Sequence, residues 1–114
     1  MNISSLFSAK TPGDRPNEIN YQDLVAALGA NSCALVDVRE VDEFAAGHVA
    51  GAINQPLSSF DPAKLPTGKP IVLMCKAGGR SATALSKAIA AGRKDVVHYP
   101  GGAMGWLKEG GQFT

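Results

Sequence analysis

The sequence has 114 residues, 45% of them hydrophobic, which predicts one domain with a single core that needs no disulfide framework. The formal net charge of +1 gives no broad electrostatic attraction to nucleic acid or to a membrane surface, and neither is an expected partner. We expect no membrane-spanning segment and no secretory signal, because the apolar runs are short and the first ten residues lack a charged leader.

The cysteines and histidines argue against a metal centre. Cys33 and Cys75 lack the C-x-x-C spacing of a redox pair or a zinc site. With His48 and His98 they make four soft ligands, no two of which are close in sequence, so we expect no metal and no cofactor. A free thiol at Cys75 favours a reducing compartment, and the expected location is cytoplasmic.

The amino-terminal half begins with a polar stretch and continues with helix and strand patterns. Residues 1–16 predict an N-terminal extension, mostly irregular, in front of a domain of residues 17–114. Asn20 is a good N-cap for an amphipathic helix, and the apolar run ending at Val38 suits a parallel strand covered on both faces. In chain order we expect an edge strand at 18–19, a helix at 21–28, a strand at 34–38, a helix at 40–46 and a brief strand up to 54.

The carboxy-terminal half alternates in the same way. Four prolines between residues 56 and 70 break the chain and leave room for one helical turn. Beyond them we expect a strand at 71–74, a helix at 81–89, a strand at 96–99 and a helix at 103–108. Because strand and helix patterns alternate throughout, the sequence predicts an α/β domain with a parallel sheet and helices on both faces.

The stretch from Cys75 to Ser81 carries the chemistry, because it joins a buried strand to a helix through a turn with two glycines. Backbone N–H groups at such a turn point inward, and the helix dipole adds partial positive charge. Lys76 and Arg80 add two full charges, so we expect a lowered pKa for the Cys75 thiol. The stretch therefore predicts an exposed, reactive thiol for an anionic or sulfur-bearing substrate.

Three stretches, residues 35–54, 75–81 and 99–106, carry a resemblance to a known family. They hold Leu-Val-Asp-Val-Arg-Glu with Gly-His-Val-Ala-Gly-Ala-Ile-Asn, then Cys-Lys-Ala-Gly-Gly-Arg-Ser, then Tyr-Pro-Gly-Gly-Ala-Met-Gly-Trp. On these motifs, which lie within residues 19–108, the chain resembles the single-domain rhodaneses, which are sulfurtransferases. The resemblance implies a rhodanese-like domain with a five-stranded, mostly parallel central sheet and helices on both faces.

The resemblance also implies an enzyme, a thiosulfate sulfurtransferase. In such proteins a loop cysteine takes a sulfane sulfur from thiosulfate or another donor, becomes a persulfide, and passes the sulfur to cyanide or a thiol. Cys75 is the expected catalytic residue, and Gly78 and Gly79 are expected to let the backbone curl around the outer sulfur. The residues expected to bind the substrate, chiefly through their backbone N–H groups, are Lys76, Ala77, Gly78, Gly79 and Arg80.

The remaining motif residues are expected to support the loop. Arg80 has two open roles, contact with the donor or bracing of the loop by pairing with a carboxylate, and Glu43 is expected to be a solvated or bracing acid. Asp37 and Arg39 are expected to brace neighbouring turns through hydrogen bonds. His48 is interpreted as a hydrogen-bonded histidine at a turn, and His98 and Trp106 are interpreted as core residues.

Three alternatives stay open at this point. A phosphatase or arsenate reductase also uses a cysteine and an arginine, but its loop is one residue longer than the four residues between Cys75 and Arg80. A non-catalytic rhodanese-like module would usually lack the loop cysteine. A persulfide relay would take its sulfur from a protein or give it to a protein acceptor, and the sequence does not separate that from thiosulfate chemistry.

Overall fold

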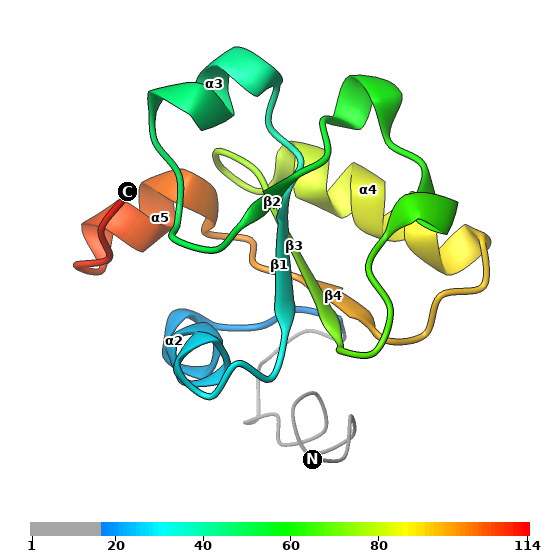
Figure 1. The fold of residues 1–114 in the computed structure, drawn as a ribbon, viewed down its shortest axis with the longest axis horizontal. Helices are drawn as coiled ribbons and strands as arrows, with labels where there is room; N and C mark the ends of the chain where they lie inside the picture. The colour runs from blue at the N-terminus through cyan, green and yellow to red at the C-terminus, as the bar shows by residue number, and fades with distance from the viewer. Residues whose placement is uncertain (1–16) are drawn as a thin grey trace.

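Four parallel strands form the sheet at the centre of the fold, in the order β2–β1–β3–β4 (Figure 1). The computed structural model describes residues 17–114, so the extension predicted for residues 1–16 lies outside the described residues. The strands are β1 at Ala34–Asp37, β2 at Ile53–Asn54, β3 at Ile71–Met74 and β4 at Val96–His98. β3 therefore lies inside the sheet, with β1 on one side and β4 on the other.

The expected fifth strand at residues 18–19 is reduced to a single parallel bridge between Glu18 and His98. Asn17 has a left-handed backbone with φ 64°, and Asn20 already caps the next helix by accepting from the Asp23 N–H. Only two residues remain between these points, too few for a regular strand. The described sheet is four-stranded for this reason.

Helices cover both faces of the sheet, as predicted (Figure 1). The helices are α2 at Tyr21–Gly29, α3 at Val41–Ala46, α4 at Gly79–Ala90 and α5 at Gly102–Lys108. Two short 3₁₀ turns, η1 at Leu57–Ser59 and η2 at Pro62–Lys64, fill the proline-rich segment. None of the helices within residues 17–114 is long and apolar enough to cross a membrane.

The central strand β3 buries side chains on both faces, which explains why its sequence is continuously apolar. In β3, Val72 and Met74 belong to the core on the side of α2 and α5, while Ile71 and Leu73 belong to the core on the side of α4. All four are fully buried. A strand covered in this way has little freedom at its carboxyl end, and the chain that follows β3 is Cys75 and its loop.

Candidate active site

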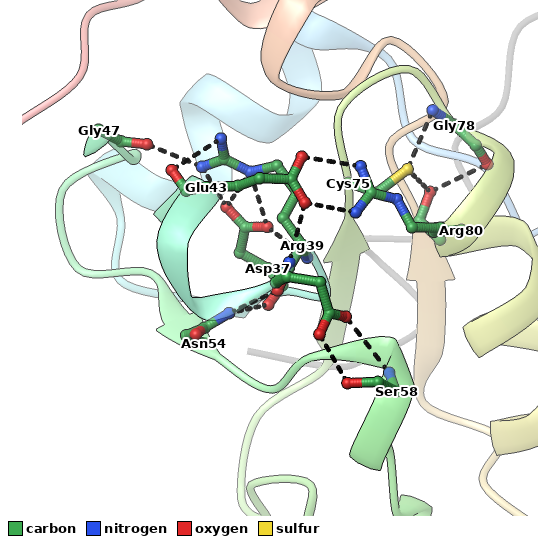
Figure 2. A network of polar contacts seen from close by, with 11 residues as sticks. Asp37, Arg39, Glu43, Gly47, Asn54, Ser58, Cys75, Gly78 and Arg80 are labelled. Carbon is green, nitrogen blue, oxygen red and sulfur yellow. Dashed lines mark hydrogen bonds and ion pairs between the residues drawn. The ribbon is translucent and has the colours of Figure 1, made fainter. Parts of the chain in front are cut away.

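The chain turns sharply between the end of β3 and the start of α4, and Cys75 lies at that turn. The Gly78 N–H donates to Cys75 Sγ across 3.1 Å (Figure 2). Burial opposes ionisation of the thiol, but the Ser81 N–H and hydroxyl and the N–H groups of Ala77 and Gly78 outweigh it, so the pKa of Cys75 lies below its ordinary value. Burial instead raises the pKa of Cys33, the other free cysteine. The two thiols are thus distinguished by their hydrogen bonds.

The expectation that the loop exposes this thiol is wrong. Cys75 is 1% exposed, because Sγ turns under the loop towards the Gly78 N–H and lies 3.6 Å from Ser81 Oγ. The same inward turn that brings an amide to the sulfur also removes the sulfur from bulk water. Lys76 and Ala77 are exposed on the outer side of the loop. A reactant that attacks Sγ must therefore displace part of its covering.

The two loop glycines differ, contrary to the expectation that both are needed for the curl. Gly78 has a left-handed φ of 103°, and a Cβ there would lie 2.5 Å from the Pro100 carbonyl oxygen. Gly79 is already the first residue of α4, and a Cβ on it would meet nothing within 4 Å. Only Gly78 is required by the backbone and by its close neighbour.

The first turn of α5 holds the loop from the other side. Gly102 has φ 63°, and a Cβ on it would lie 2.5 Å from the Lys76 carbonyl oxygen. The Ala103 N–H donates to the Cys75 carbonyl at 2.8 Å, and the Met104 N–H donates to the Lys76 carbonyl at 3.0 Å. The Tyr-Pro-Gly-Gly motif is thus a backbone support for the cysteine loop.

Arg80 is paired with Glu43, which places it in the bracing role. Its Nη1 and Nη2 donate to Glu43 Oε1 and Oε2 at 2.6 and 3.0 Å, joining α4 to α3 (Figure 2). These hydrogen bonds lower the pKa of Glu43 to about 2 and raise the pKa of Arg80. Coulombic attraction to Cys75 also raises the pKa of Arg80, so its charge acts on the sulfur. A direct contact of Arg80 with substrate stays a prediction.

A buried ion pair holds the turn after β1. Asp37 is fully buried, and Arg39 donates to its carboxylate through Nε at 3.0 Å and Nη2 at 2.8 Å. Nη2 also donates to the Gly47 carbonyl at 2.8 Å, just past the end of α3. Asn54 donates to the backbone carbonyls of both Asp37 and Arg39. This network fixes α3, and with it the Glu43 carboxylate that holds Arg80 (Figure 2).

Two residues close to the sulfur were not assigned a site role from the sequence. Ser81 Oγ lies 2.9 Å from His98 Nδ1, and Sγ of Cys75 lies on its other side. His98 was interpreted as a core residue. It pairs in register with Leu73 on β3, two residues before Cys75 in the sequence, and this sheet position is the signal that could have placed it beside the loop.

Metal ligation finds no support around this loop. Within the part of the chain that the structure describes, no group of three or more His, Cys, Asp or Glu side chains could hold a metal ion. The polar groups that converge at Cys75 are backbone N–H donors, a hydroxyl and a guanidinium, which together stabilise negative charge on sulfur. The arrangement suits a thiolate or a persulfide anion.

Comparison with known proteins shows which family and which fold the chain resembles. The model of the family described as "Rhodanese-like domain" matches residues 20–109. MoeZ of Mycobacterium tuberculosis, named a probable adenylyltransferase/sulfurtransferase, is 42% identical over 80 residues, which are 67% of this chain and 20% of MoeZ. The thiosulfate:glutathione sulfurtransferase of Saccharomyces cerevisiae is 28% identical over 109 residues, covering 81% of this chain and 78% of that protein.

A solved structure shares the fold. The crystal structure of a rhodanese-related protein from Thermoplasma volcanium matches with a TM-score of 0.77 at 30% identity, covering 86% of this chain and 97% of that one. The chain spans only a fifth of MoeZ and less than half of another relative that is 41% identical over its match. The similarity therefore concerns one segment of each of those longer proteins and not their activities as whole proteins.

Proposed function

The chain belongs to the rhodanese-like domain family of sulfurtransferases, and on that premise we propose that Cys75 carries a sulfane sulfur from thiosulfate to a thiol or to cyanide. The observation that carries this proposal is the Gly78 N–H aimed at a sulfur whose pKa is lowered. A thiolate is the form that attacks sulfur, and a donor group already directed at it stabilises the anion at every stage.

The reaction has two displacements. The Cys75 thiolate attacks the outer sulfur of thiosulfate, the S–S bond of the donor breaks, and sulfite leaves with the electron pair. The acceptor then attacks the outer sulfur of the persulfide, and the Cys75 thiolate leaves. Each step needs a stabilised sulfur anion and no external oxidant or reductant.

The loop backbone supplies that stabilisation in the proposed mechanism. The N–H groups expected to surround the outer sulfur belong to Lys76, Ala77, Gly78, Gly79 and Arg80. The contact that supports this cradle is the Gly78 N–H, at 3.1 Å from Sγ. The exposed Lys76 ammonium would attract the dianionic donor and stabilise departing sulfite.

The test is the intact mass of the protein after incubation with thiosulfate. We expect a gain of one sulfur that cyanide removes, and we expect no gain in Cys75→Ser. Cys33→Ser is the matched control, because Cys33 is also a free buried thiol but its pKa is raised by burial. A gain that persists in Cys75→Ser, or is lost in Cys33→Ser, would contradict the assignment.

A persulfide relay is the second candidate, and the burial of Cys75 favours it. Because the thiol is 1% exposed, a protein partner that moves the loop on docking would make the sulfur accessible to the donor or acceptor. MoeZ, whose matching segment is one part of a longer chain, fits the same idea. Comparing thiosulfate with a persulfidated protein as donor separates the two, because slow transfer from thiosulfate with fast transfer from the protein donor would favour the relay.

A phosphatase-type reaction is less well supported. It uses an arginine that binds the oxyanion through two N–H donors, and in this chain both η nitrogens of Arg80 donate to Glu43. We expect no hydrolysis of an aryl phosphate that depends on Cys75. Hydrolysis that is robust in the wild type and absent in Cys75→Ser would reverse this ranking.

A further inference from the structure

A line of polar side chains runs from Cys75 into the protein, through Ser81 and His98 to Glu18. Sγ lies 3.6 Å from Ser81 Oγ, Ser81 Oγ lies 2.9 Å from His98 Nδ1, and His98 Nε2 lies 3.6 Å from Glu18 Oε2. Cys75, Ser81 and His98 are 1%, 0% and 5% exposed. Four groups from four segments of the chain thus meet in a line that ends at a carboxylate.

The hydrogens of this line can be assigned. Glu18 Oε2 faces His98 Nε2 at 3.6 Å, and its negative charge favours the hydrogen on Nε2, so a neutral His98 has a bare Nδ1 that accepts the Ser81 hydroxyl proton. The Ser81 oxygen can then accept the thiol hydrogen of Cys75. Burial lowers the pKa of His98 although Glu18 opposes this, so the imidazole is neutral before the transfer. In this arrangement the thiol, the hydroxyl and Nε2–H all point along the line towards Glu18, and the Gly78 carbonyl is a second acceptor within reach of the hydroxyl.

We propose that His98 is the proton acceptor for Cys75, reached through Ser81, and that Glu18 stabilises the imidazolium that forms. This inference rests on the proposed sulfur transfer, because it supplies the thiolate that attacks the donor. The S–H bond of Cys75 breaks and its proton moves to Ser81 Oγ, while the original hydroxyl proton moves to His98 Nδ1. No atom changes oxidation state, and the proton returns along the same line when the thiolate is released.

The transfer also redirects the Ser81 hydroxyl. Once Nδ1 carries a hydrogen it donates to Ser81 Oγ, and the hydroxyl proton is free to donate to the new thiolate. The Gly78 carbonyl, 3.2 Å from Oγ, is the competing acceptor, but an anionic sulfur attracts the hydrogen more strongly than a neutral carbonyl does. His98 never touches the sulfur, so its part is that of a positioning residue that also stores the proton.

The charged groups around the pair do not obscure its titration. Glu18 acts on His98 from the segment before α2, and Arg80 acts on Cys75 from α4. Arg80 is held by Glu43 of α3, whose pKa is about 2, while the pKa of Arg80 is raised. These two side chains keep their charges across the neutral range.

The first test follows the rate at which iodoacetamide alkylates Cys75, measured on the Cys75 peptide by mass spectrometry from pH 5 to pH 10. His98→Asn keeps a polar group beside Ser81 but takes up no proton. We expect it to raise the midpoint by about one pH unit, which slows alkylation roughly tenfold below the midpoint. The matched control is His48→Asn, because His48 contacts Phe44 and not the loop, and its midpoint should equal that of the wild type.

An unchanged midpoint in a folded His98→Asn protein would overturn the proposal. The second test needs no change at His98: the ring resonances of His98 are titrated by NMR in the wild type and in Cys75→Ser. The negative thiolate should stabilise the imidazolium, so the pKa of His98 should be higher in the wild type by at least half a unit. Equal values would overturn the proposed proton transfer from Cys75 to His98. Neither test uses a sulfur donor, so failure of the proposed proton transfer can be distinguished from failure of the proposed sulfur transfer.

Discussion

Gly78→Ala and Gly79→Ala form a pair of neighbouring substitutions with opposite expected effects. At Gly78 the alanine must adopt φ 103°, and its Cβ would lie 2.5 Å from the Pro100 carbonyl oxygen. The left-handed backbone costs about 1–2 kcal/mol, and relieving the contact by a backbone shift costs about 1–3 kcal/mol more. We expect Gly78→Ala to lose about 2–5 kcal/mol of the free energy of unfolding by these two terms.

Gly79→Ala should be neutral or stabilising. Gly79 is the first residue of α4, and its Cβ would enter open space. Alanine in a helix is favoured over glycine by up to about 1 kcal/mol, chiefly because it restricts the unfolded chain more, so less conformational entropy is lost on folding. The two alanines therefore differ by at least about 2 kcal/mol although they stand side by side.

Urea unfolding followed by circular dichroism measures this difference directly, and the slope of the transition checks that both variants unfold in the same way. The alkylation rate of Cys75 gives a second readout, because moving the Gly78 N–H removes a donor from Sγ and should slow the reaction at neutral pH. Equal unfolding free energies for the two variants would refute the argument from φ and from the Pro100 contact.

Three further outcomes are expected. Because the pKa of Glu43 is about 2 in the folded protein, its pair with Arg80 contributes stability above the ordinary carboxyl range and loses it as the pH falls towards 2. The stability gap between wild type and Glu43→Gln should thus shrink on acidification, and a gap that does not change with pH in urea titrations would count against the pair. Asp37→Asn leaves Arg39 charged and buried, and should cost about 3–5 kcal/mol in thermal unfolding; a loss below about 1 kcal/mol would contradict this. Cys75→Ser should unfold within about 1 kcal/mol of the wild type, since a hydroxyl also accepts the buried N–H donor; a larger loss would give the thiol a packing role.

Much of the fold could be predicted from local patterns. Continuous apolar runs such as residues 71–74 indicate strands covered on both faces, and their alternation with helices indicates the parallel sheet. The edge strand predicted at residues 18–19 is only a single bridge, because the left-handed turn at Asn17 and the cap at Asn20 leave too little extended chain between them. Such limits depend on backbone angles that a run of residue types does not display.

The site was predictable in its residue types and less so in its arrangement. Lys76, Arg80 and the glycines point to an anion-stabilising loop, but residue types alone do not say whether Cys75 faces outward or inward. The partner of Arg80 comes from α3, and the partner of Ser81 comes from β4. Contacts between segments far apart in the sequence follow from the packing of the sheet, and His98 was interpreted as structural for this reason.

The support that the Gly102 turn gives the cysteine loop bears on how portable the chemistry is. Residues 75–81 look like a self-contained cassette when printed as a sequence. Their backbone, however, is pressed against Pro100 and Gly102 and tied through two carbonyls to α5. Grafting residues 75–81 alone onto another strand–helix junction would therefore move the nucleophile without the backbone that shapes its loop. A graft that keeps the reactivity must also include the segment from Pro100 to the start of α5.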